Sequence, residues 1–126
     1  MPWAQLVAVA VGGATGATLR ALANAAFADR LTVPTTATVL VNIAGSLLIG
    51  IAVPVLATAS PAWRLLIVTG LLGSLTTFST FSYETVELLQ HRQYIAAAVN
   101  AIGSLVVGLL AVAAGLTIGG RLAPTG

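Results

Sequence analysis

Hydroxyl side chains are most concentrated in one short segment, 70–84, which reads G-L-L-G-S-L-T-T-F-S-T-F-S-Y-E. Within it, seven consecutive positions hold five hydroxyl residues with two phenylalanines between them: Thr76, Thr77, Phe78, Ser79, Thr80, Phe81 and Ser82. Hydroxyl protons donate hydrogen bonds, and an aromatic ring has a positive edge around a negative face. These groups offer a small anion several donors, and none of them is a full charge that would hold the anion in place.

Asn42 adds an amide NH₂ to these donors. Phe78 and Phe81 are three residues apart and would share one face of a helix. Each group also has a purely structural alternative. A hydroxyl can bond to the carbonyl four residues back, an asparagine can join two membrane helices for about 1 kcal/mol, and two phenylalanines can simply pack. For Asn100, near the start of the last predicted helix, we expect only such a helix contact.

The amino-acid composition indicates whether these groups lie in water or in a membrane. Of the 126 residues, 58% are hydrophobic and 6% are charged, whereas soluble domains have about 25% charged residues. Because so few charged residues cannot cover the surface of a soluble domain, we predict one integral membrane domain, residues 1–126. The absence of cysteine excludes disulfides and thiolate metal sites. The arginines form no basic run, which leaves no basis for binding nucleic acid.

The apolar stretches predict an all-α membrane protein. A membrane-spanning helix needs about 20 apolar residues, and four stretches qualify: 3–27, 36–57, 63–89 and 94–118. The connections between them carry prolines and charged residues. Transmembrane barrel strands would be about ten residues long and alternate strictly, and no such alternation occurs. The sequence therefore predicts four transmembrane helices.

The hydroxyl segment falls at the middle of the third predicted helix, near Thr76. Unsatisfied polar groups are costly at this depth of a bilayer. Five hydroxyls behind Gly70 and Gly73 favour a broken helix, whose free backbone groups must face protein, water or an ion. We therefore expect the two glycines to interrupt this helix.

The arginines are divided almost evenly between the two sides of the membrane. Arg64 and Arg121 lie on the side of the termini, whereas Arg30 and Arg92 lie on the other side, with Arg20 in the last turns of the first helix. Orientation normally follows an excess of Lys and Arg on the cytoplasmic side, and no excess exists here. We predict insertion in both orientations and an antiparallel homodimer of dual topology. The alternative is that weaker signals select one orientation.

An internal similarity supports construction from two related halves. The segment N-I-A-G-S-L-L-I-G at 42–50 resembles N-A-I-G-S-L-V-V-G at 100–108. Glycines at close spacing, as in Gly12-x-x-x-Gly16 and Gly115-x-x-x-Gly119, allow helix backbones to approach each other in lipid. Most of these glycines are therefore expected to serve packing alone.

The acidic residues are informative because they are few. Glu84, Glu87 and His91 share a helix face near the end of the third helix; we favour a solvated cluster at headgroup level over a metal site. The first, second and fourth helices contain no carboxylate, so no proton relay is evident. The sequence has no nucleophile–base pair and no phosphate-binding loop. An enzyme is therefore not expected.

Three motifs resemble the Fluc (CrcB) family of bacterial fluoride channels. They are G-x-x-G-A-x-x-R at 13–20, V-N-x-x-G-S at 41–46 and G-x-x-G-S-x-T-T-F-S-T-F-S at 70–82. The resemblance extends over all four predicted helices. It implies an antiparallel dimer in the bacterial inner membrane, with two fluoride pores along the subunit interface that export fluoride from the cytoplasm.

The resemblance also implies roles for individual residues. Asn42, Phe78 and Phe81 match residues that contact fluoride, and the hydroxyls of Ser79, Thr80 and Ser104 match the continuation of its path. The backbone carbonyls of Gly73 and Thr76 match the ligands of a structural Na⁺ on the dimer axis. Arg20, the last residue of the first motif, either attracts anions at the pore entrance or anchors the first helix, and the sequence does not decide between these two roles.

Two other classes of membrane protein share some of these features. A small four-helix, dual-topology multidrug exporter would have similar size and insertion, but it needs an acidic residue within the first helix, which this chain lacks. A purely structural membrane subunit would leave the hydroxyl and phenylalanine segment without a role. A fluoride channel accounts for more of the sequence than either.

Overall fold

The computed structural model describes residues 1–28 and 35–124, and every regular element in these ranges is a helix. The first and second helices are α1 (Trp3–Ala28) and α2 (Thr35–Val55). The third consists of α3 (Pro61–Arg64), the π-helical segment η1 (Leu65–Leu72), α4 (Gly73–Leu75) and α5 (Phe78–Gln90). The fourth consists of α6 (Tyr94–Ala98), the π-helical segment η2 (Val99–Gly103) and α7 (Ser104–Leu122).

The prediction of four membrane-spanning helices is confirmed. Four helical stretches are long and apolar enough to cross a membrane, at Trp3–Ala28, Thr35–Val55, Pro61–Gln90 and Tyr94–Leu122. Their bounds differ from the predicted ones by at most four residues, and the first and fourth helices begin at the predicted residue. The predicted first connection, with Asp29, Arg30 and Pro34, lies outside the described residues.

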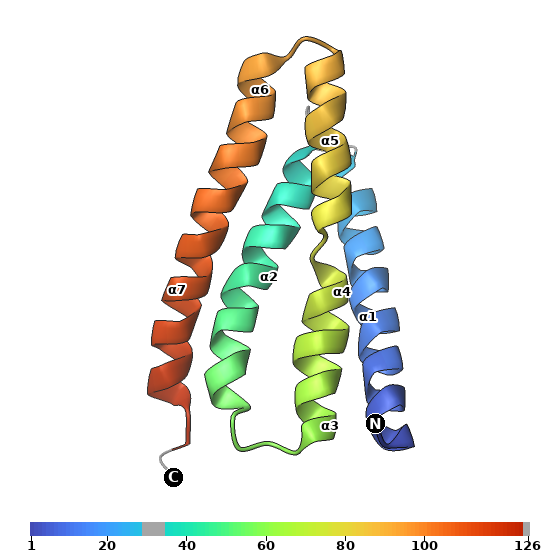
Figure 1. Cartoon of the computed structure of the whole chain (residues 1–126), viewed down its shortest axis with the longest axis vertical. Coiled ribbons are helices and arrows are strands. Elements are labelled where there is room, and N and C mark those ends of the chain that lie inside the picture. Colours follow the sequence, from blue (N-terminus) through green and yellow to red (C-terminus); the bar gives the residue numbers. More distant parts are fainter. Residues whose placement is uncertain (29–34, 125–126) are drawn as a thin grey trace.

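Two pairs of helices make the closest packing in the chain. Helix α2 packs along α7, and α1 packs along η1 and α4. Figure 1 shows α2 between α7 and the third helix, with the N-terminus, the α2–α3 turn and the end of α7 at the same end of the molecule. This placement of the N-terminus, the α2–α3 turn and the end of α7 agrees with the short connections from which the topology was predicted.

Glycines make both close packings possible. A Cβ atom at Gly16 would overlap the carbonyl of Leu71, and a Cβ atom at Gly115 would overlap the carbonyl of Leu47. Gly12 and Gly119 are equally constrained, against η1 and α2 respectively. The predicted role of these four glycines in close helix packing is therefore confirmed, and any side chain there would push two backbones apart.

The expectation that Gly70 and Gly73 interrupt the third helix is wrong. Gly73 has helical angles, φ −64° and ψ −31°, and Gly70 is a helical residue that lies against Val9 and Gly12 of α1. The residues with extended backbone are Thr76 (φ −83°, ψ 155°) and Thr77 (φ −150°, ψ 124°). β-Branched threonines favour extended backbone, whereas Gly70 provides close packing.

Candidate functional site

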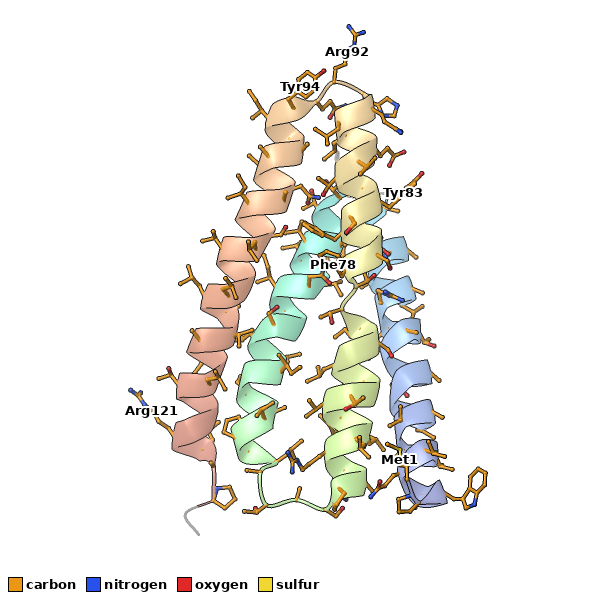
Figure 2. All side chains as sticks on the ribbon, in the orientation of Figure 1. Met1, Phe78, Tyr83, Arg92, Tyr94 and Arg121 are labelled. Atoms are coloured by element: carbon orange, nitrogen blue, oxygen red, sulfur yellow. The ribbon has the colours of Figure 1, made fainter. Side chains whose placement is uncertain are left out.

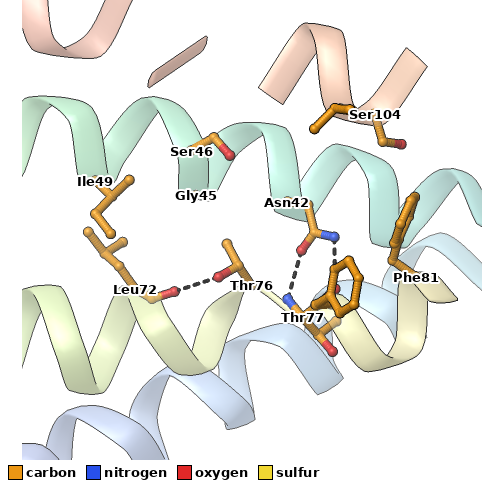
Figure 3. Close-up of a pocket in the computed structure, with 11 residues that line it drawn as sticks. Asn42, Gly45, Ser46, Ile49, Leu72, Thr76, Thr77, Phe81 and Ser104 are labelled. Carbon is orange, nitrogen blue, oxygen red and sulfur yellow. Dashed lines mark hydrogen bonds between the residues drawn. The ribbon is translucent and has the colours of Figure 1, made fainter. Parts of the chain in front are cut away.

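A cavity of about 310 Å³ lies beside the extended residues of the third helix. Figure 3 shows side chains from α2, the third helix and the fourth helix converging on it. Its lining consists of Asn42, Gly45, Ser46, Ile49, Leu72, Thr76, Thr77, Phe78, Phe81, Ser104 and Leu105. The structure therefore brings Asn42, both phenylalanines and Ser104, all predicted site residues, to one cavity.

Asn42 holds the extended backbone in place from the neighbouring helix. Its Oδ1 accepts a hydrogen bond from the backbone N–H of Thr77 at 2.8 Å, and its Nδ2 donates to the carbonyl of Thr77 at 3.0 Å. Both backbone groups of Thr77 are thereby satisfied where the helix cannot satisfy them. The amide has one further N–H, and Asn42 lines the cavity (Figure 3).

Thr77 begins the second half of the helix, a role that sequence reasoning missed. Its Oγ1 accepts a hydrogen bond from the backbone N–H of Thr80 at 3.3 Å, which is an N-cap contact. The same hydroxyl contacts Thr80 Oγ1 at 3.2 Å and Ser79 Oγ at 3.3 Å. Ser79 and Thr80 do not line the cavity. The sequence feature that could have indicated this role is a threonine directly before a helical segment.

The interruption leaves several backbone carbonyls without their helical donors, among them those of Gly73 and Thr76. A continuous helix would direct the N–H of Thr77 to the carbonyl of Gly73, but that N–H donates to Asn42. It would direct the N–H of Thr80 to the carbonyl of Thr76, but that N–H donates to Thr77 Oγ1. The carbonyls of Gly73 and Thr76 are therefore released for another partner.

The interruption also places two helix ends of opposite polarity near each other. The C-terminal end of α4 carries free carbonyls and partial negative charge, and the N-terminal end of α5 carries free N–H groups and partial positive charge. The first end suits a cation and the second suits an anion. Both phenylalanines lie in the first turn of α5.

Phe78 and Phe81 form a tilted pair in the cavity wall. Their ring centroids are 5.8 Å apart and the ring planes meet at 41°. Phe78 is 79% exposed in the single chain, and Figure 2 shows it beside the interruption. Ser104 faces the same cavity, and its Oγ is buried without a hydrogen-bond partner.

Two hydroxyls of the segment 70–84 are bonded to the backbone four residues earlier in the chain. Thr76 Oγ1 donates to the carbonyl of Leu72 at 3.1 Å, and Ser82 Oγ donates to the carbonyl of Phe78 at 2.9 Å. These are bonds to the carbonyl four residues back. The side chains of Thr76 and Ser82 therefore need no further function, whereas that of Thr77 shapes the interruption.

None of the charged residues within 1–28 and 35–124 lines the cavity. Glu84 Oε1 accepts a hydrogen bond from Thr38 Oγ1 at 2.7 Å, and the Nδ1 of His91 contacts the carbonyl of Glu87 at 2.8 Å. Within residues 1–28 and 35–124 no group of three His, Cys, Asp or Glu could hold a metal. Arg20 is half-buried on α1 and does not line the cavity.

Comparisons with known proteins give a consistent result. The family model for CrcB-like protein, Camphor Resistance (CrcB), matches residues 7–116. The chain is 44% identical over 118 residues to the fluoride-specific ion channel FluC of Acidobacterium capsulatum, and the alignment covers 90% of this chain and 94% of that one. It is 47% identical over 120 residues to FluC of Pseudomonas syringae pv. maculicola, covering 89% and 91%.

Proposed function

This chain belongs to the CrcB family, and we propose that it is a fluoride-specific ion channel that lets fluoride leave the cytoplasm and so reduces its toxicity. One observation of this structure carries the proposal. Asn42, Phe78, Phe81 and Ser104 line a single cavity that the third helix opens at its interruption. All four supply hydrogen-bond donors or positive ring edges, and none carries a charge.

The geometry indicates how a fluoride ion would be handled. Fluoride leaves water only if other donors replace its hydration shell. The second N–H of Asn42, the ring edges of the two phenylalanines and the hydroxyl of Ser104 provide such donors, and the N-terminal end of α5 adds a favourable dipole. Because these interactions are individually weak, the ion can also leave, as conduction requires. We place Ser79 and Thr80 further along the path.

Fluoride efflux from liposomes tests the function directly. Purified protein in fluoride-loaded vesicles should release fluoride, as followed by a fluoride electrode, and vesicles loaded with chloride should retain it. The alternative, a proton-coupled multidrug exporter, needs an embedded acid in the first helix, and α1 contains none. Proton-driven transport of a cationic dye without fluoride efflux would reverse this assignment.

We further propose that the working unit is an antiparallel homodimer in the bacterial inner membrane. Phe78 is largely exposed in the single chain, so the cavity is open on the face where a second copy would complete it. The near-equal division of arginines between the two sides of the membrane supports insertion in both orientations. Arg20, half-buried near the end of α1, would attract anions toward the pore entrance.

A structural Na⁺ on the two-fold axis is the third part of the proposal. The carbonyls of Gly73 and Thr76 have lost their helical donors, and carbonyl oxygens are suitable ligands for a hard cation. Two such carbonyls from each copy would supply the ligands. Bound there, the ion would neutralise the carbonyl ends of both third helices and join the copies at their interruptions.

A crystal structure of the assembled protein tests the dimer and the ion together. We expect two antiparallel copies related by a two-fold axis, with density on the axis surrounded by the carbonyls of Gly73 and Thr76 from both copies. Metal–oxygen distances near those typical of sodium would identify the ion. A parallel dimer, or an axis from which these carbonyls are remote, would contradict the proposal.

A further inference from the structure

Asn100 is a buried asparagine for which the sequence predicted no role beyond a helix contact. It lies in η2, the π-helical segment of the fourth helix, and is 6% exposed. Its Nδ2 donates a hydrogen bond to Thr85 Oγ1 at 2.8 Å. Thr85 Oγ1 in turn donates to the carbonyl of Phe81 at 2.8 Å. A chain of two hydrogen bonds therefore joins Asn100 to the backbone of a residue in the cavity wall.

The two hydrogen bonds of the Thr85 hydroxyl fix the orientation of the Asn100 amide. A threonine hydroxyl has one proton, and Thr85 uses it on the carbonyl of Phe81. Thr85 can then only accept from Asn100, so the NH₂ end of the amide must face it. The Oδ1 of Asn100 consequently points elsewhere, and it is buried without a hydrogen-bond partner.

The two asparagines of the internal repeat hold the same helix on both sides of Phe81. Asn42 bonds to Thr77, one turn before Phe81, and Asn100 bonds to Thr85, one turn after it. Phe81 and Thr85 are four residues apart and so lie on one face of α5, and Thr77 is the extended residue that caps the start of this helix. The turn that carries the Phe81 ring is thus fixed at both ends by side-chain amides from other helices.

Stability alone does not account for an asparagine at this position. Interhelical hydrogen bonds in membranes contribute little on average, and a buried carbonyl oxygen without a donor is destabilising. The residue also lies in a π-helical segment, and such segments occur frequently at functional sites. An apolar residue would fill the same space without the unpaired oxygen.

We propose that Asn100 is a positioning residue for the anion path: through Thr85 it fixes the turn of α5 that presents the Phe81 ring to the cavity. The proposal rests on the proposed function, because it takes Phe81 as part of the path. Asn100 itself does not line the cavity, so it would act on the ion only through the position of Phe81.

A double-mutant cycle separates this role from direct contact with the ion. Asn100→Leu and Thr85→Val should each slow fluoride efflux by about three- to tenfold, and the double variant should be no slower than either single one. Thr85→Ser, which keeps the hydroxyl, should restore most of the rate. In a Phe81→Ile background, Asn100→Leu should have no further effect.

Thr117→Val is the matched control. Thr117 Oγ1 donates to the carbonyl of Ala113 at 3.0 Å, which is the same kind of back-bond as that of Thr85, but Thr117 is exposed. We expect its efflux rate to equal that of the wild type. If Asn100→Leu slows efflux by the same factor with and without Phe81, then Asn100 acts independently of Phe81 and the proposal is wrong.

A spectroscopic measurement keeps the positioning role testable apart from transport. With 4-fluorophenylalanine placed at position 81, the ¹⁹F resonance in fluoride-free buffer should shift in Asn100→Leu and Thr85→Val, and stay unchanged in Thr117→Val. An unchanged resonance in all three would overturn the proposal. If the wild type released no fluoride, the proposed function would fail, and the resonance would still decide the role of Asn100.

Discussion

Asn42→Asp should abolish most fluoride conduction. The substitution places a carboxylate in the cavity and removes the N–H that donates to the carbonyl of Thr77. A charge about 5 Å from the ion at an effective dielectric constant near 20 opposes it by roughly 3 kcal/mol. Since about 1.4 kcal/mol corresponds to a tenfold change in rate, efflux from liposomes should fall by at least about a hundredfold.

Asn42→Leu separates the added charge from the lost hydrogen bonds. Leucine has a similar size but leaves both backbone groups of Thr77 without partners, so the variant should be less stable and slower than the wild type. It adds no charge, however, and should remain faster than Asn42→Asp. Elution of both variants as dimers in detergent checks folding. Equal rates for the two variants would mean that the carboxylate lies outside the path.

Phe78→Ile and Phe81→Ile should each slow fluoride efflux by about ten- to a hundredfold while leaving the protein folded. Isoleucine keeps the apolar bulk, and volume-conserving exchanges usually cost less than about 1.5 kcal/mol of stability. It cannot provide the positive ring edge. Loss of one or two donors, each contributing about 1–2 kcal/mol, raises the barrier for the ion and produces this range of rates. Electrode-monitored efflux measures it.

The third phenylalanine provides the control. Phe27 lies near the end of α1 and does not line the cavity, so Phe27→Ile should conduct like the wild type. If Phe78→Ile and Phe81→Ile also conducted at the wild-type rate, the rings would serve packing, and the ion would follow another face of the helices.

The helices and most of the cavity residues could be predicted from the sequence because they depend on local patterns. Long apolar stretches determine the membrane spans, and the concentration of hydroxyls near Thr76 marked the site. The position of the interruption could not be predicted in the same way. Gly70 looked like a helix breaker, yet its small size serves contact with α1, which only the packed structure reveals.

The roles of the two asparagines depend on contacts between distant segments. Asn42 was predicted as a donor to the ion, but its bidentate contact with Thr77 requires that α2 and the interruption lie side by side. The contact of Asn100 with Thr85 depends in the same way on the packing of η2 against α5. A sequence repeat shows that such residues are related, but not which backbone each one reaches.

If a second copy covers the exposed Phe78, as proposed, the activity depends on the amount of protein in the membrane. A path completed only by a second copy obeys mass action, so the number of conducting units at low density rises with the square of the amount of protein in the membrane. Dilution into excess lipid should then silence the protein before it unfolds. A cell that makes both the wild type and Asn42→Asp would contain many mixed pairs, and the defective copy would impair its partner.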